Sequence, residues 1–261
     1  MSADVTIRTV ADALGLPDGA WVDVRVPKKM LVEQGAPTSA DKRAIQDGID
    51  ELQWFAACKP ATIGVPAFSD ETREYLEIAI VGCAFRPSAK AKRLIELIHR
   101  AIPYPVVLVT SDESGLAVSV AHKRRAQNEA DRTVIDRVVA ATGLHPTEEE
   151  TAESLFLRSL QLSNQPRTDL YALYAGWVAR IEALNSARLT GLFPEAFDLP
   201  TVEARRVALE QFEQLAKQVQ QLRSQAARVR MFNQRVELNQ RIQGLDKELS
   251  RQRAILLGEP K

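Results

Sequence analysis

The stretch YLEIAIVGCAF, Tyr75–Phe85, is the most apolar strand-like segment of the chain. Its apolar residues hardly alternate with polar ones, which is typical of a strand that is covered on both faces of its sheet. Residues 88–102 (SAKAKRLIELIHRAI) come directly after Pro87 and repeat apolar residues at helical spacing. We therefore expect a central strand with a helix laid against its sheet.

More strands are predicted on either side of this stretch. Residues 21–26 (WVDVRV) alternate with period two, and residues 61–68 (ATIGVPAF) form a strand that an internal proline restricts to a sheet edge. Residues 105–111 and 116–123 are apolar runs joined by the turn-forming DESG, as in an antiparallel hairpin. Residues 133–141 (TVIDRVVAA) are ambiguous between strand and helix, and their β-branched side chains favour a further strand.

A helix is expected between the first two of these strands. Thr38 and Asp41 have the spacing of a helix start, and apolar residues then recur at helical spacing from Ile45 to Phe55. Together these patterns predict that residues 1–146 form an α/β domain. Its core is expected to be a mixed sheet of about five or six strands with flanking helices.

From residue 147 onward the pattern becomes helical. Thr147 and Glu150 have the spacing of a capping box, and a second helix is expected to begin near Thr168. We assign residues 147–200 to a helical hairpin or linker module. Residues 201–261 are predicted to form a long coiled-coil helix, so the C-terminal module as a whole is helical.

The predicted helix from Thr201 to Leu257 has no internal proline and carries a heptad pattern. A strict 3-4 spacing of apolar positions runs to Val236, where the phase slips by two residues and a second stripe begins. Asn233 at an a position favours a defined register, usually in a parallel dimer. The stripe is expected either to fold back on the helices of 147–190 or to pair with another chain. The predicted interface consists of Phe212, Leu215, Val219, Leu222, Ala226, Val229, Asn233, Val236, Leu238, Ile242, Leu245 and Leu249.

The composition is that of a globular protein with balanced charge. Lys plus Arg and Asp plus Glu each number 34, so the molecule as a whole has no electrostatic attraction to nucleic acid or anionic membranes. Cys58 and Cys83 lack metal-ligand spacing and are too few for a disulfide scaffold, which predicts a reducing compartment and, by default, the cytoplasm. We expect no signal peptide, and no apolar run approaches the roughly 20 residues of a membrane helix.

Familiar catalytic motifs are missing from the sequence: it has no GxSxG, Walker A, HExxH or paired CxxC pattern. His99, His122 and His145 are scattered and are interpreted as surface or capping groups. Glu77 invites comparison with restriction-type nuclease cores, but the lysine of their E-x-K motif is replaced by Ala79. We therefore predict no catalytic residue, no metal ligand and no cofactor, and we favour a protein that is not an enzyme.

Basic residues follow two of the predicted strands. Lys28 and Lys29 come after the strand of residues 21–26, and a second group begins at the end of the strand of residues 116–123. If these two strand ends share one edge of the sheet, the side chains form a positive patch that binds phosphate or a partner protein. The alternative is that they only solubilise the strand ends. The second group is His122, Lys123, Arg124 and Arg125.

Five segments together resemble a bacterial and archaeal family called domain of unknown function 4391. They are VPKKMLVEQGAPTSADKR, YLEIAIVGCAFRP, IHRAIPYPVVLV, LAVSVAHKR and NQRVELNQRIQGLDKEL, and the resemblance extends from about Trp21 to Leu249. It implies a companion of helicases and DNA methyltransferases in restriction or phage-defence gene clusters. It supplies no catalytic residues.

These observations favour a non-enzymatic accessory subunit of a bacterial DNA-processing or phage-defence system. We expect it to dock on a larger partner, a helicase or a methyltransferase, through the C-terminal helix, and we expect no membrane partner. The alternative is a nucleic-acid-binding protein or a degenerate metal-dependent nuclease that uses the basic strand ends. A third interpretation is a homodimer whose C-terminal helix pairs only with its own copy.

Overall fold

The computed structural model describes residues 6–126, 129–145, 149–194, 197–229 and 231–258. The chain forms two compact units, residues 1–181 and 182–261, and the boundary falls within helix α7 (Leu170–Thr190). None of the described helices is long and apolar enough to cross a membrane.

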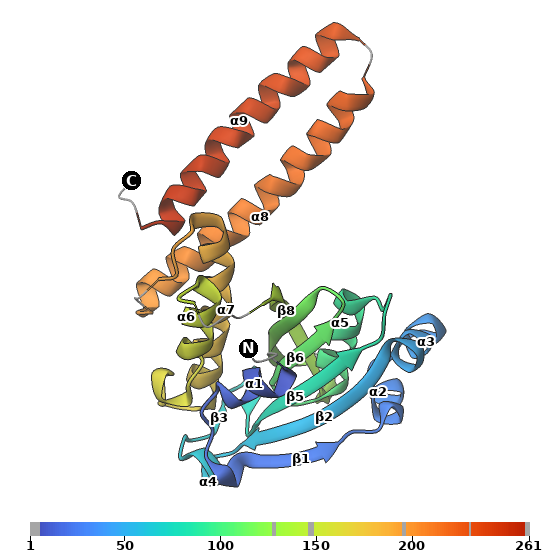
Figure 1. The fold of residues 1–261 in the computed structure, drawn as a ribbon, viewed down its shortest axis with the longest axis vertical. Coiled ribbons are helices and arrows are strands. Elements are labelled where there is room, and N and C mark those ends of the chain that lie inside the picture. Colours follow the sequence, from blue (N-terminus) through green and yellow to red (C-terminus); the bar gives the residue numbers. More distant parts are fainter. Residues whose placement is uncertain (1–5, 127–128, 146–148, 195–196, 230, 259–261) are drawn as a thin grey trace. The chain divides into compact units, whose positions relative to one another are not determined.

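The first unit is built on a six-stranded mixed sheet in the order β1-β2-β5-β6-β7-β8 (Figure 1). β5 and β6 are parallel and all other neighbours are antiparallel, so the prediction of an α/β domain with a mixed sheet is confirmed. β5 lies inside the sheet and every residue in it except Ala84 is buried. The strands are β1 (Trp21–Arg25), β2 (Ile49–Cys58), β5 (Ile78–Phe85), β6 (Val106–Asp112), β7 (Gly115–Ala126) and β8 (Glu129–Leu144).

Helices cover both faces of this sheet. On one face, α2 (Lys28–Gly35), α3 (Ser39–Gly48) and α5 (Ala91–Ala101) enclose a core that includes alternate residues of β5. On the other face, α1 (Ile7–Asp12) packs on β5 and β6, and the first turns of α7 reach the start of β6. This double coverage is the reason that β5 reads as a continuous apolar run. The first unit also contains α4 (Pro60–Ile63), the short pair β3 (Phe68–Ser69) and β4 (Glu74–Tyr75), α6 (Ala152–Ser159) and two 3-10 turns, Asp18–Ala20 and Leu162–Asn164.

β1 is an edge strand with an irregular backbone. Its pairing with β2 shifts register between Trp21 and Val24. Between them, Asp23 has a φ of 49°, in the left-handed region that non-glycine residues rarely adopt. Arg8 of α1 donates a hydrogen bond of 2.7 Å to the Asp23 carboxylate, which holds the irregular segment in place.

The helix predicted from Thr38 through Phe55 is wrong in its second half. Thr38 does cap a helix, by accepting a hydrogen bond of 3.1 Å from the amide of Asp41, but that helix ends at Gly48 and β2 follows. The strand breaks register with β5 near Ile49 and again after Trp54. Such bulges disturb the period-two alternation, so the apolar residues of β2 recur at a spacing that resembles a helix.

Two further predictions concern residues 61–68 and the start of the helix after residue 147. The strand predicted for residues 61–68 is wrong, because Pro60 begins the short helix α4 and only Phe68 at the end of that range belongs to a strand. The predicted capping residue Thr147 lies outside the described residues. The helix that follows is α6, and Thr151 caps it by accepting a hydrogen bond of 3.2 Å from the amide of Ser154.

The second unit is a helical module that contains the last turns of α7, α8 (Leu199–Arg228) and α9 (Phe232–Leu256). The single long helix predicted from Thr201 to Leu257 is therefore wrong. The chain is extended at Val229 and Met231, and α9 then runs back along α8 (Figure 1). We call α8 and α9 together the C-terminal hairpin. Folding back lets each helix cover apolar residues of the other, which one isolated helix of that length would leave in water.

Candidate functional site

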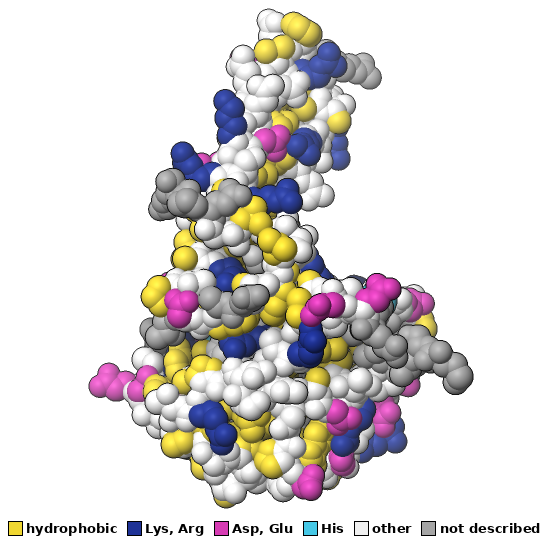
Figure 2. All heavy atoms as spheres, turned by 60° about the vertical axis from the view of Figure 1, so that its left-hand side comes forward, with side chains coloured by type: hydrophobic (Ala, Val, Ile, Leu, Met, Phe, Trp, Pro, Cys, Tyr) yellow, Lys and Arg dark blue, Asp and Glu magenta, His cyan; other side chains and the backbone are white. Residues whose placement is uncertain are grey.

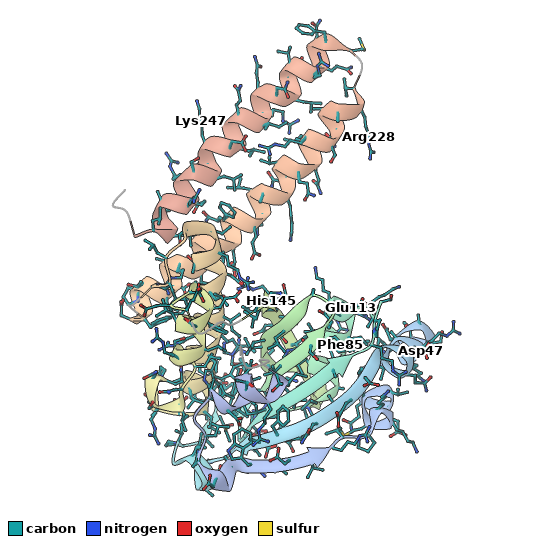
Figure 3. The ribbon with its side chains drawn as sticks, in the orientation of Figure 1. Asp47, Phe85, Glu113, His145, Arg228 and Lys247 are labelled. Carbon is teal, nitrogen blue, oxygen red and sulfur yellow. The ribbon has the colours of Figure 1, made fainter. Side chains whose placement is uncertain are left out.

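The first predicted basic group lies where β5 ends. Lys28 is the first residue of α2, and its ammonium donates a hydrogen bond to the backbone carbonyl of Ile49. Lys29 is exposed and lies 3.6 Å from the carboxylate of Glu33. Phe85, the last residue of β5, is labelled at this end of the sheet in Figure 3.

The second predicted group lies at the opposite end of the sheet. β7 runs antiparallel to β6 and therefore finishes near the place where β5 begins. Arg124 forms an ion pair of 3.1 Å with Asp136, and Arg125 forms one of 2.9 Å with Glu74. Because β1 and β7 run in opposite directions, the structure does not bring the two predicted groups into one patch.

His122 and Lys123 point to opposite faces of β7. His122 faces α7, and its Nδ1 is 2.7 Å from the hydroxyl of Tyr75. The rings of Tyr171 and Tyr174 lie 5.2 and 5.3 Å from that imidazole, measured between ring centroids. Burial raises the pKa of the Tyr75 phenol, so this cluster is a packed aromatic group whose hydroxyl stays neutral.

Lys123 is the most unusual of the predicted residues because its side chain is only 2% exposed. Its ammonium donates hydrogen bonds to the backbone carbonyls of His99 and Ile102, at the C-terminal end of α5. The end of a helix carries unpaired carbonyls and partial negative charge, so a cation there completes the helix. Burial lowers the pKa of Lys123 to about 7.

His99 is the neighbour of Lys123 in the same core. Its Nε2 lies 3.1 Å from the hydroxyl of Ser119, and burial together with the charge of Lys123 lowers the imidazole pKa to about 3. Perturbed titrations of this kind often mark active sites. Here all three side chains are sealed in the core, so the arrangement caps α5 and cannot meet a substrate.

Glu77, the acid that prompted the comparison with nucleases, directly precedes β5. Its carboxylate is 3.0 Å from the ammonium of Lys59 and its side chain is largely buried. Among the residues that the structure describes, no group of three His, Cys, Asp or Glu side chains is arranged to hold a metal ion.

A cavity of about 730 Å³ lies between α5 and β8 in the first unit. Ile95 of α5 and Val138 of β8 supply apolar walls, and Arg100 and Asp136 stand at its margin. The size suits a small organic molecule or an inserted side chain. Sequence reasoning missed it, since its walls come from segments forty residues apart.

The predicted coiled-coil residues are divided by the turn of the hairpin. Val219 of α8 and Ile242 of α9 are buried, whereas Asn233 and Val236 are exposed and Val229 lies in the turn. Asn233 therefore does not occupy a buried a position within the chain. The other predicted interface residues are half-buried along the hairpin: Phe212, Leu215, Leu222, Ala226, Leu238, Leu245 and Leu249.

A groove of about 400 Å³ follows one side of the hairpin. Leu222 and Leu245 form its floor, and Gly244 leaves one wall open because a Cβ atom there would meet nothing within 4 Å. Sequence reasoning also missed Met231 and Phe232, which are highly exposed at the turn. The sequence marks these two apolar residues only by their position, because neither occupies an a or d position of the heptad pattern.

Comparison with known proteins identifies one relationship. A family model described as "Domain of unknown function (DUF4391)" matches residues 14–249, which is about nine-tenths of the chain. No curated protein and no solved structure matches it. The chain therefore belongs to the family of the domain of unknown function DUF4391.

Proposed function

We propose that the protein is a non-enzymatic accessory subunit that docks on a larger partner through its C-terminal hairpin. The observation that carries the proposal is the incomplete burial of the hairpin's apolar stripes. Two helices cover each other's stripe from one side only, whereas the corresponding positions of a three-helix or four-helix bundle are enclosed. One more helix would complete the core.

The groove between α8 and α9 indicates what kind of partner would fit. Its floor is leucine and its rim carries side-chain amides, among them Gln218 and Gln225. The open space at Gly244 allows another backbone to approach closely. We therefore propose that the occupant is an amphipathic helix of the partner, with its apolar face on Leu222 and Leu245.

The proposed identity of the partner rests on the family resemblance. The resemblance implies that this chain is a companion of helicases and DNA methyltransferases in bacterial restriction or phage-defence clusters. We therefore propose that its partner is a helicase or a DNA methyltransferase. We propose a cytoplasmic location for this complex, which is consistent with the two cysteines, Cys58 and Cys83, since both are buried and unpaired.

The test places a bulky side chain in the groove. In Gly244→Phe the ring would occupy the space that the partner helix needs, and its Cβ atom would meet no atom of the chain within 4 Å. Asn239→Phe is the matched control. Asn239 is exposed on the same helix, and five residues correspond to about 140° around its axis from Gly244.

Tagged full-length variants would be expressed in the native host, and the proteins that co-purify would be identified by mass spectrometry. We expect the wild type and Asn239→Phe to recover one helicase or methyltransferase in near-stoichiometric amount, and Gly244→Phe to recover at least tenfold less. Circular dichroism would verify that each variant is folded. Equal recovery with all three proteins would refute docking in the groove.

A further inference from the structure

The turn of the C-terminal hairpin and the first turn of α9 present an exposed segment. Every residue from 231 to 237, which we call the tip segment, is exposed. Cross-helix contacts explain this exposure: Arg223 of α8 pairs with Asp246 of α9 at 3.1 Å, and Gln225 shares the groove with Arg241. The end of α8 therefore lies alongside residues that follow the tip segment, so the first turns of α9 extend beyond it.

Two large apolar side chains stand at the start of the tip segment. Met231 is 64% exposed and Phe232 is 69% exposed, and Val236 follows one helical turn after Phe232. Figure 2 shows hydrophobic and Lys or Arg side chains together at the end of the hairpin drawn uppermost. Adjacent exposed apolar side chains of this size indicate a contact surface.

The charge around the tip segment differs from that of the whole chain. Arg223 is neutralised by Asp246, but the described residues from 224 to 241 still contain three arginines and one glutamate, although the full sequence is neutral. Within the described part of the chain, Arg228, Arg235 and Arg241 take part in no ion pair. Arg228 is labelled at the end of α8 in Figure 3. The segment is thus positive, and arginines precede and follow the apolar pair in the chain.

We infer that the tip segment binds double-stranded DNA. Arg228 and Arg235 would contact phosphates, and binding would release the cations condensed on the duplex. Met231 and Phe232 would act as a wedge between neighbouring base pairs, because side chains of this kind unstack a base step and bend the duplex. Charge complementarity selects this occupant, since a polyanion matches a surface that carries arginines and a single acid.

Four residues are proposed to contact DNA: Arg228, Met231, Phe232 and Arg235. None of them lines the groove proposed for a partner helix, although Arg241 does. Phe232 precedes Gly244 by twelve residues, which is about 18 Å along α9. A partner helix and a DNA duplex therefore require different parts of the hairpin. Gly244→Phe should leave DNA binding unchanged, so failure of one proposal is distinguishable from failure of the other.

The electrostatic part is tested with the full chain and a fluorescein-labelled 20-base-pair duplex. Fluorescence anisotropy at several salt concentrations gives the slope of log K against log salt. In Arg228→Ala/Arg235→Ala this slope should become shallower by about 2, roughly 1 for each lost phosphate contact. The control Lys247→Ala/Arg251→Ala removes two charges from the distant part of α9 and should keep the wild-type slope.

The wedge is tested with Met231→Ser/Phe232→Ser and a duplex that carries a fluorescent donor and acceptor at its ends. The wild type should shorten the distance between the ends, and the variant should bind with the same salt slope but leave the duplex straight. Val207→Ser is the control. Val207 is an exposed apolar residue of α8, outside the tip segment, so this variant should still bend the duplex.

Three outcomes would overturn the inference. The first is an absence of binding at low salt, and the second is an unchanged slope in Arg228→Ala/Arg235→Ala. The third is equal or tighter binding of a single-stranded probe, which has no base step to unstack. If Met231→Ser/Phe232→Ser instead loses a protein partner while no DNA binds, the tip segment is a protein-docking surface.

Discussion

Replacing Lys123 by methionine should remove a pH dependence of stability between pH 7 and pH 9. Burial lowers the pKa of this ammonium from the ordinary 10.5 to about 7, while its hydrogen bonds go to the carbonyls of His99 and Ile102. Between these two pKa values the folded protein binds fewer protons than the unfolded chain. The free energy of unfolding of the wild type therefore rises with pH across this range.

The size of the effect follows from the two pKa values. A shift from 10.5 to about 7 gives a rise of about 2 kcal/mol in the free energy of unfolding between pH 7 and pH 9. Because the two carbonyls favour the charged ammonium, this figure is an upper bound. His99 does not interfere: its pKa is lowered to about 3, so its contribution rises between pH 3 and about 6.5 and is complete above that.

Urea titrations at pH 7, 8 and 9 would measure the free energy of unfolding of the wild type and Lys123→Met. Tryptophan fluorescence reports on the first unit alone, since Trp21, Trp54 and Trp177 all lie within residues 1–181. Lys29→Met changes an exposed lysine and should keep the wild-type slope. The difference between wild type and Lys123→Met cancels the titration of every other group. Parallel pH profiles for these two proteins would refute the reasoning.

Three further substitutions test the first unit. Tyr174→Phe should lower the free energy of unfolding by about 1–3 kcal/mol in urea titrations, since it leaves buried backbone groups of β6 and β7 without their hydroxyl partner. Gly82→Ala should destabilise by about 1–3 kcal/mol in the same assay, because its Cβ would lie 2.3 Å from the ring of Phe55, and wild-type stability would contradict this. The pKa of Asp41 is lowered to about 2 by Arg93, so wild-type stability should fall as pH drops from about 4 to 2. The pKa values of Asp70 and Asp198 are also lowered, so these carboxylates contribute to the same acid loss. Melting temperatures of Asp41→Asn should therefore fall less than those of the wild type over this range, and an identical acid profile would contradict the assignment.

The elements that the sequence predicts correctly are those in which the spacing of apolar residues within the element shows which faces are buried. β5 is buried on both faces and reads as an unbroken apolar run, and α5 places one apolar stripe against the sheet. The hairpin of β6 and β7 is also found, because the turn-forming DESG joins two apolar strands, and Gly115 at the start of β7 has a φ of 113° that favours glycine.

The wrong predictions have causes that the local sequence pattern does not reveal. Bulges in β2 disturb its alternation, and no sequence pattern marks a bulge that lacks glycine. The chain leaves the helical conformation at Val229 and Met231 without a proline or glycine, so a heptad pattern continues through a position where the helix stops. Whether the two basic groups form one patch could not be predicted, because the direction of each strand decides which end of the sheet it reaches, and that depends on the whole topology.

The irregular backbone of β1 has a consequence for the protein at high concentration. A regular edge strand offers a row of unpaired amides and carbonyls that can template a strand of another molecule. In β1 the left-handed Asp23 and the register shift interrupt that row beside two exposed valines, Val22 and Val24. Arg8 fixes the interruption through its bond to Asp23. We therefore expect the irregular β1 to disfavour edge-to-edge pairing with a strand of a second molecule.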